Sequence, residues 1–382
     1  MCPEIDQRLL TSSPTTDWGQ LCHLSHPSFG GILAETVEVW IVRPSARIDR
    51  ASSAGEQVKP GALGVGLLLL VVSLTILTGL SEIGLRIFCR ESLGISRDER
   101  TMLYRYDEVL GWRPVANSSN RFVGSREITV VNNSLGFRAP EPVTNGHPGL
   151  MFLGDSFVWG YDVEAPERFT DKLQARHPEW NIYNLGVSGY GTDQEFLLLQ
   201  MQFARYQPRV VFVVYSAETD EEDNSTNFRY EGYYKPYCTI LTNRLQIQGL
   251  PVPRSERVFV AEHRLLARSY FVRLLARAWF KLTAPPVLFN PSPTGAILLN
   301  MQHFVHSQGA ALAVGLTLPR PPLQEFLRHY DIPCVDLTTM LRYPTNGFHW
   351  TPEGHTVVCD RIDEFLTKGK FLGRTAVPLR DP

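Results

Sequence analysis

A continuous apolar stretch is the feature that most constrains how this chain can fold. Residues 61–80 read GALGVGLLLLVVSLTILTGL and contain no charged side chain. A helix of about 20 residues spans roughly 30 Å, the thickness of the hydrocarbon core of a bilayer. A buried core helix seldom runs so far without a polar stripe, and a cleaved signal peptide has a shorter apolar part nearer the start. We therefore expect one transmembrane helix over residues 61–81 and a single-pass membrane protein.

The residues around this segment do not orient it in a membrane. Four Lys or Arg side chains precede it closely and four follow it, so the positive-inside rule gives no preference. Residues 1–60 are dotted with Ser, Thr and Pro and lack sustained periodicity. They are interpreted as a poorly ordered tail, or as translated upstream sequence with a natural start close to Lys59. A second short tail is expected over residues 371–382.

The overall composition excludes several classes of protein. Lys and Arg number 37 against 39 Asp and Glu, which is unlike the basic excess of a nucleic-acid-binding protein. Six scattered cysteines without a C-x-x-C pair indicate neither a disulfide scaffold nor a zinc site. No cofactor and no metal are expected.

The chain beyond the apolar segment alternates between strand and helix patterns. Residues 82–145 are interpreted as a connector with one strand over 127–132, and residues 146–370 as one domain with an insertion over about 219–293. The alternation predicts a doubly wound parallel sheet with ligands outside the carboxyl ends of its strands. The insertion contains one basic amphipathic helix, at 258–282. In the domain, strands are expected at 149–154, 181–186, 209–216, 310–317 and 332–337, and helices at 166–176, 193–205, 296–307, 323–329 and 352–366.

Ser156 is the first candidate for chemistry. It stands in the sequence GDSF directly after the first apolar strand, where a side chain is exposed at the ligand edge of a parallel sheet. Serine is also a preferred helix N-cap, so a capping role is the alternative.

His349, in FHWTPEGH, is the second candidate, because the loop after the last strand reaches the same edge. A neutral imidazole there could take the serine proton and return it later. The alternative is a histidine packed between Phe348 and Trp350, and His355 is the weaker candidate because it lies one turn into the helix.

A glycine-rich loop and an acidic run complete the candidates. NLGVSGYG, residues 184–191, follows the second strand, and the amide of Gly189 could approach an oxyanion with no side chain in the way. A plain turn is the alternative interpretation. The acidic run at residues 218–223 contains no histidine and is interpreted as a solvated face rather than a metal site.

Three sequence blocks resemble those of the SGNH (GDSL-type) hydrolases: GDSFVWG, NLGVSGYGTDQ and GFHWTPEGH. The anchor followed by YDEVLGWRP and NSLGFR is similar to membrane-anchored bacterial members. The resemblance implies a flavodoxin-like α/β/α fold with about five parallel strands. It also implies a domain outside the cytoplasm that cleaves or transfers acyl esters, often acetyl groups on carbohydrate. It makes Ser156 the nucleophile, His349 the base, and the amides of Ser156 and Gly189 the oxyanion donors.

Two positions depart from the family pattern. Thr219 stands where the family has an Asn whose side chain donates to the oxyanion, and Asn346 stands where the family has the Asp of its Asp-x-x-His motif. Loss of one oxyanion donor costs about 10²–10³ in turnover, and Asp→Asn in a related triad costs about 10⁴. Three compensations are conceivable: another carboxylate such as Asp336 or Glu353, a backbone carbonyl, or deamidation of the Asn346-Gly347 pair.

Two functional hypotheses follow. One is a membrane-anchored serine esterase or acyltransferase acting on acyl esters of carbohydrate or lipid, O-acetyl esters included. The other is a catalytically weakened relative that binds glycan or acyl groups in cell-envelope assembly. A carboxylate at Nδ1 of His349 would favour the enzyme. If the family geometry is intact, Asn346→Asp should raise activity.

Overall fold

The computed structural model describes residues 60–371 except 96–98, 144, 231 and 370. The predicted tails lie outside the described residues, apart from Pro60 and Phe371. The chain divides into two units, and the boundary between them falls between Ser81 and Glu82. Each unit is described by itself.

The apolar segment forms α1 (Pro60–Phe88), which continues seven residues beyond the predicted end. Its most apolar window, within Gly64–Phe88, has a mean hydropathy of 2.2 and is not buried against any described part of the chain. A core helix of a soluble protein would bury such side chains. Within the described residues, α1 is the one helix long and apolar enough to cross a membrane.

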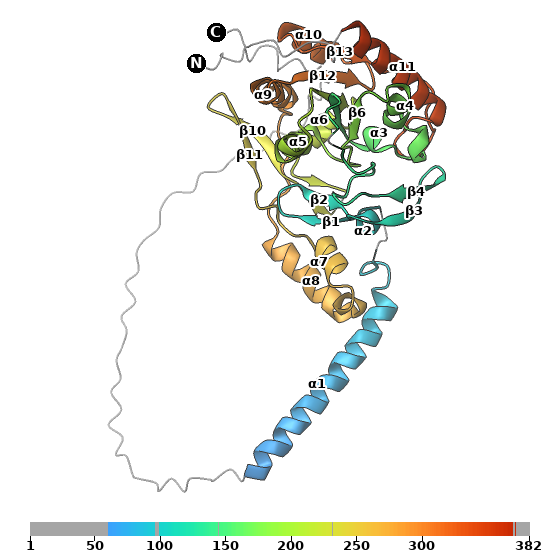
Figure 1. Ribbon diagram of the computed structural model, residues 1–382. Coiled ribbons are helices and arrows are strands. Elements are labelled where there is room, and N and C mark those ends of the chain that lie inside the picture. Colours follow the sequence, from blue (N-terminus) through green and yellow to red (C-terminus); the bar gives the residue numbers. More distant parts are fainter. Residues whose placement is uncertain (1–59, 96–98, 144, 231, 370, 372–382) are drawn as a thin grey trace, which may run out of the picture. The chain divides into compact units, whose positions relative to one another are not determined.

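A five-stranded parallel sheet forms the centre of the larger unit (Figure 1). Its strand order is β13-β12-β7-β5-β6, which confirms the predicted sheet. Strands β5 and β7 are buried along their whole length, as their unbroken apolar runs indicate. The strands are β5 (Gly149–Gly154), β6 (Asn181–Asn184), β7 (Val210–Tyr215), β12 (Ala311–Leu316) and β13 (Cys334–Asp336).

Helices cover both faces of the sheet and make three layers. Successive residues of a strand point to opposite faces, so Met151 and Leu153 join one apolar cluster while Leu150 and Phe152 join the other. The first cluster includes side chains of α5 (Thr192–Tyr206), α9 (Thr294–Ser307) and α10 (Pro321–His329). The second includes side chains of α3 (Ser156–Trp159), α4 (Phe169–Arg176) and α11 (Pro352–Lys368). The 3-10 turn η2 (Ala165–Glu167) precedes α4.

The connector is an ordered part of this unit. It forms α2 (Glu99–Leu103) and two antiparallel strand pairs, and its side chains Leu103, Trp112 and Phe122 belong to the first apolar cluster. The predicted strand at 127–132 is one of these four. The pairs are β1 (Tyr104–Asp107) with β2 (Gly111–Pro114), and β3 (Ser119–Val123) with β4 (Glu127–Val131).

The insertion differs from its prediction in one respect. The single basic helix expected at 258–282 is broken into α7 (Glu256–Glu262), the 3-10 turn η3 (Leu266–Arg268) and α8 (Tyr270–Thr283). The break occurs because Ser269 caps a new helix, its hydroxyl accepting from the amide of Val272 at 3.3 Å. Before α7 the insertion forms α6 (Asp220–Asp223), β8 (Phe228–Arg229), β9 (Tyr233–Tyr234), β10 (Tyr237–Leu241) and β11 (Arg244–Gln248).

Candidate active site

Ser156 begins the short helix α3 immediately after the carboxyl end of β5. Asp155 caps this helix, its Oδ1 accepting from the amide of Phe157 at 2.9 Å. Ser156 is therefore the first helical residue, and the capping role considered for it from the sequence belongs to Asp155. Its hydroxyl is left available for another partner.

That partner is His349, which lies 193 residues further along the chain. The distance from His349 Nε2 to Ser156 Oγ is 2.7 Å. His349 lies in the loop between β13 and α11, and its backbone carbonyl accepts from the amide of Tyr343 at 2.8 Å. Two residues later Thr351 caps α11, so the loop is fixed on both sides of the imidazole. The structure thus brings together the two side chains that the sequence singled out at opposite ends of the domain.

The imidazole of His349 is enclosed by aromatic rings. It stacks on Tyr161 with ring centroids 4.3 Å apart and lies 5.2 Å from the ring of Phe157. Burial lowers its pKa to about 4, the backbone of Asn346 opposes this shift, and the positive charge of Arg342 adds to it. His349 is therefore neutral at physiological pH, as a general base must be, and is a weak base.

The Nδ1 atom of His349 has no carboxylate partner. It makes no hydrogen bond within the part of the chain described here. The side chain of Asn346 points elsewhere, donating from Nδ2 to Ser125 Oγ at 3.3 Å. Asp336 and Glu353, the two carboxylates considered from sequence, are not bonded to it either. The backbone of Asn346 raises the pKa of this imidazole, against the larger lowering by burial.

The turn before His349 has an unusual backbone. Asn346, Gly347 and Phe348 all have positive φ, at 52°, 86° and 54°. A Cβ at position 347 would lie 2.8 Å from His349 Cε1, so glycine is required there for the ring to pack against the turn. A bulky residue such as Phe348 rarely adopts this conformation, and such strain persists where the surrounding structure enforces it.

The glycine-rich loop lies beside the nucleophile turn. The amide of Val187 donates to the carbonyl of Gly154 at 3.0 Å, which joins the loop to the end of β5. Gly189 has φ of 77°, a conformation that favours glycine. Its amide donates no hydrogen bond to any other described residue, which leaves it free for an external acceptor.

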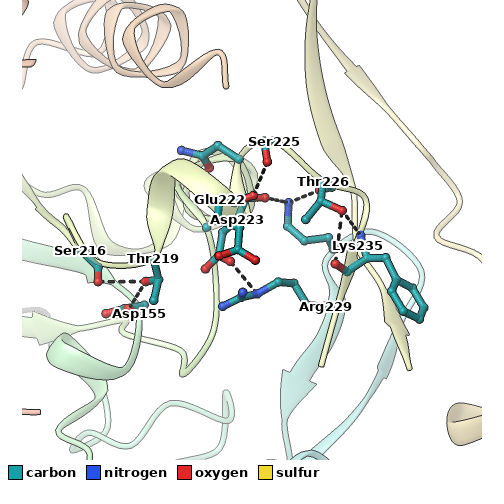
Figure 2. A network of polar contacts seen from close by, with 12 residues as sticks. Asp155, Ser216, Thr219, Glu222, Asp223, Ser225, Thr226, Arg229 and Lys235 are labelled. Carbon is teal, nitrogen blue, oxygen red and sulfur yellow. Dashed lines mark hydrogen bonds and ion pairs between the residues drawn. The ribbon is translucent and has the colours of Figure 1, made fainter. Parts of the chain in front are cut away.

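The hydroxyl of Thr219 contacts Ser216 and Asp155, as Figure 2 shows. It bonds Ser216 Oγ at 2.9 Å and lies 3.4 Å from Asp155 Oδ2. A hydroxyl has a single proton to donate, and both of these contacts compete for it. Thr219 therefore does not supply a free donor of the kind expected at this position.

The acidic run at 218–223 is only partly solvated, so the interpretation as a solvated face was wrong for two of its members. Asp220 and Asp223 are fully buried. Asp223 lies 2.6 Å from Arg229 Nε, and burial raises its pKa to about 8. The described residues contain no group of acidic, His or Cys side chains arranged to hold a metal ion.

One charged residue near the site, Arg342, could not be identified from the sequence. Arg342 Nη2 donates to the carbonyl of Thr317 at 2.8 Å, and its Nη1 forms an ion pair with Glu218. Its guanidinium lies 5.2 Å from the ring of Phe157. Arg342 lies near His349 only because the loop between β13 and α11 returns to the carboxyl edge of the sheet.

The Ser–His pair is nearly closed to solvent. Ser156 is 9% exposed and His349 is 8% exposed. A cavity of about 1030 Å³ lies at another place in this unit, where α7 contributes Val260 and α8 contributes Phe280 to its lining, and it includes neither member of the pair. A substrate would have to reach the pair by a local opening of the surrounding side chains.

The fold and this geometry define a class, namely an α/β/α protein with a serine–histidine pair at the carboxyl edge of its sheet. No family model matches the chain, and no curated protein matches it. The solved structures that resemble it include TesA, with a TM-score of 0.34, 12% identity, and coverage of 58% of this chain and 98% of that one. They also include a lipolytic protein of the G-D-S-L family from Veillonella parvula, with a TM-score of 0.33, 11% identity, and coverage of 58% and 98%.

A third similar structure is the esterase EstA from Pseudoalteromonas, with a TM-score of 0.36, 10% identity, and coverage of 58% of this chain and 98% of that one. The similar structures thus include an esterase and several proteins named as G-D-S-L or GDSL-like, the family that the sequence blocks resemble.

Proposed function

We propose that this protein is a serine esterase or acyltransferase that acts through Ser156 and His349. The observation that carries the proposal is the 2.7 Å contact between Ser156 Oγ and His349 Nε2 at the carboxyl edge of the sheet. The catalytic unit is residues 146–370, with the insertion at 219–293 shaping the access to the site. Acyl esters of carbohydrate or lipid, O-acetyl esters included, are the substrate class that the sequence resemblance favours.

The reaction follows from the roles of these groups. Neutral His349 takes the proton of Ser156 Oγ as that oxygen attacks the ester carbonyl, and the amides of Ser156 and Gly189 stabilise the oxyanion. The imidazolium then gives its proton to the leaving alcohol, and an acyl-serine remains. Water or a sugar hydroxyl attacks the acyl-serine, and His349 takes its proton and returns it to Ser156 Oγ as the acid or the new ester leaves. The ring of Tyr161 and the close packing of Gly347 hold the imidazole in place of a carboxylate.

The low pKa of His349 limits the rate of this reaction. A general base works best when its pKa is near the working pH, and a pKa of about 4 gives a weaker driving force for deprotonation of serine. We therefore expect a slow enzyme.

The membrane part of the proposal rests on α1. We propose that α1 crosses the membrane once and that the α/β/α unit lies outside the cytoplasm, as the resemblance to anchored bacterial members implies. The support is the length, apolar composition and exposure of α1. Extraction of the full chain from membranes at alkaline pH tests the anchor, since a spanning protein stays in the pellet.

A binding module is the second candidate. Two observations favour it: His349 Nδ1 has no carboxylate partner, and the Thr219 hydroxyl is engaged with Ser216. Such a protein would hold a glycan or acyl group in envelope assembly and turn over little or none.

Hydrolysis of p-nitrophenyl acetate by the full chain in detergent micelles separates the two. The esterase proposal predicts that Ser156→Ala lowers turnover by at least about 10³. Ser307→Ala, at the end of α9 and away from the site, is the matched control and keeps the wild-type rate. Equal rates for wild type and Ser156→Ala would reject the esterase and favour the binding module.

A further inference from the structure

A buried arginine contacts the glycine-rich loop from the connector. Arg100 Nη1 donates to the carbonyl oxygen of Ser188 at 2.5 Å. Trp112 Nε1 donates to the same oxygen at 3.3 Å. Both donors come from residues 82–145, a segment that the sequence suggested only as a connector.

The carbonyl of Ser188 and the N–H of Gly189 belong to one peptide group. A donor on the carbonyl polarises that group and makes its N–H a stronger donor, and a charged donor does so most. We propose that Arg100 is a positioning residue that strengthens the oxyanion-binding amide of Gly189. The inference rests on the proposed function, since it deepens the account of the same site.

The surroundings of Arg100 bury its guanidinium and keep it positively charged. Its side chain is 4% exposed, and its guanidinium lies 4.2 Å from the ring of Tyr230 and 4.8 Å from that of Tyr104. Burial lowers its pKa, but Glu99 and the neighbouring tyrosines more than reverse this, so the pKa is raised overall. A permanent charge in a poorly solvated place polarises its neighbours far more than it would in water.

Gly189 makes this approach sterically feasible. A Cβ at that position would lie 2.4 Å from Arg100 Nη2 and 2.2 Å from the hydroxyl oxygen of Tyr230. Any other residue would displace the guanidinium or the phenol. Glycine at position 189 therefore leaves room for Arg100 on one side of the loop. Its amide is the group proposed to bind the oxyanion on the other side.

The contact between Arg100 and Ser188 also bears on the oxyanion donor that Thr219 does not supply. Because the hydroxyl of Thr219 is engaged with Ser216, the oxyanion would depend on two backbone amides. Strengthening one of them offsets part of the loss. The cation acts through the peptide group and does not itself touch the substrate.

The polarisation can be measured directly, without turnover. Ser188-Gly189 is the one Ser-Gly dipeptide in the sequence, so the full chain labelled with carbonyl-¹³C serine and ¹⁵N glycine gives a single carbonyl–amide correlation. Arg100→Met should move both the Ser188 carbonyl and the Gly189 nitrogen signals upfield, and Arg100→Lys should move them less. Arg273→Met is the matched control, because Arg273 is also buried but donates to the carbonyl of Leu93 and not to the loop.

Kinetics on the same variants complete the test. Arg100→Met should lower kcat by about 10- to 100-fold with KM within about twofold, since an oxyanion interaction is made only in the transition state. Arg100→Lys should recover part of the loss, which a merely structural role would not predict.

The outcomes distinguish this inference from the proposed function. An unmoved Gly189 signal, or a change confined to KM, overturns the role of Arg100 whatever the rate of the enzyme. Equal turnover by wild type and Ser156→Ala instead overturns the esterase, and with it any catalytic use of the polarised amide. A shifted signal together with a kcat loss that Lys partly restores supports the inference.

Discussion

The imidazole of His349 stacks on the ring of Tyr161, with centroids 4.3 Å apart and planes inclined by 22°. In a Ser–His–Asp triad a carboxylate fixes the orientation of the histidine. Here the stacked phenol and the turn before His349 hold the ring instead. We therefore expect the stack to contribute to the proposed catalytic geometry.

Replacement of Tyr161 tests this arrangement. Tyr161→Phe keeps the stacked ring and should leave kcat within about twofold. Tyr161→Ala frees the imidazole and should lower kcat roughly tenfold, in line with an aromatic contact of about 0.5–1.5 kcal/mol. Steady-state kinetics at a temperature well below the melting point of each variant measures this, and equal losses in both variants would contradict an orienting stack.

Asn346→Asp probes the position where the family has its acid. The sequence alone predicts a gain in activity if the family geometry is intact. In the structure the side chain of Asn346 faces Ser125, so a carboxylate at this position would bond there and not to His349. We now expect kcat to change by less than about threefold. A tenfold rise would mean that the side chain can turn to Nδ1.

The pH dependence of activity follows from the low pKa of His349. Burial and the charge of Arg342 lower this pKa to about 4, and the base acts only when it is unprotonated. The profile of kcat/KM should therefore rise through about pH 4 and be flat at neutral pH. Arg342→Gln removes a positive charge, so the acid limb should move to higher pH, whereas Arg342→Lys should leave it nearly in place. An acid limb near pH 6.5 in the wild type would contradict this environment.

Glu195 should make stability depend on pH in the opposite sense to an ordinary salt-bridged acid. It is fully buried, and neither carboxylate oxygen bonds to a described residue. Burial, with the nearby carboxylates of Asp155, Asp193 and Asp223, raises its pKa well above the usual value. The folded state keeps a proton that the unfolded state releases, so stability falls as pH rises above about 4.5.

Glu195→Gln removes this dependence. Each unit of raised pKa is equivalent to about 1.4 kcal/mol, so the variant should melt a few degrees higher than wild type at pH 8 and near wild type at pH 4. Glu364→Gln, on the exposed face of α11, should change the melting temperature by less than about 1 °C at either pH. Calorimetry of the full chain measures both, and a gain that is equal at both pH values would contradict a buried protonated Glu195.

The sequence anticipated the parts of this protein that local patterns determine. The apolar runs of β5 and β7 identified the parallel sheet, and the carboxyl-edge rule then placed Ser156 near His349. Tertiary contacts decided the rest. The direction of the Asn346 side chain depends on three consecutive positive φ angles, which no spacing reveals.

Two further features depend on tertiary contacts. The burial of Asp223 is partly offset by Arg229 and by Lys235, which bonds its carbonyl, and a run of acids alone indicates a solvated loop. Arg100 lies in α2, outside the sequence blocks that resemble the family, and only the packing of α2 against the glycine-rich loop brings it to Ser188. Charged residues buried through long-range partners are the class that sequence patterns miss here.

The most direct test of the central claim is covalent capture of the nucleophile. The full chain in detergent would be treated with a p-nitrophenyl alkylphosphonate, digested, and examined by mass spectrometry. The account predicts one phosphonylated residue, Ser156, and strongly slowed labelling in His349→Ala because the base is gone. Labelling at another serine, or none at Ser156 under conditions that inactivate a known serine esterase, would contradict it.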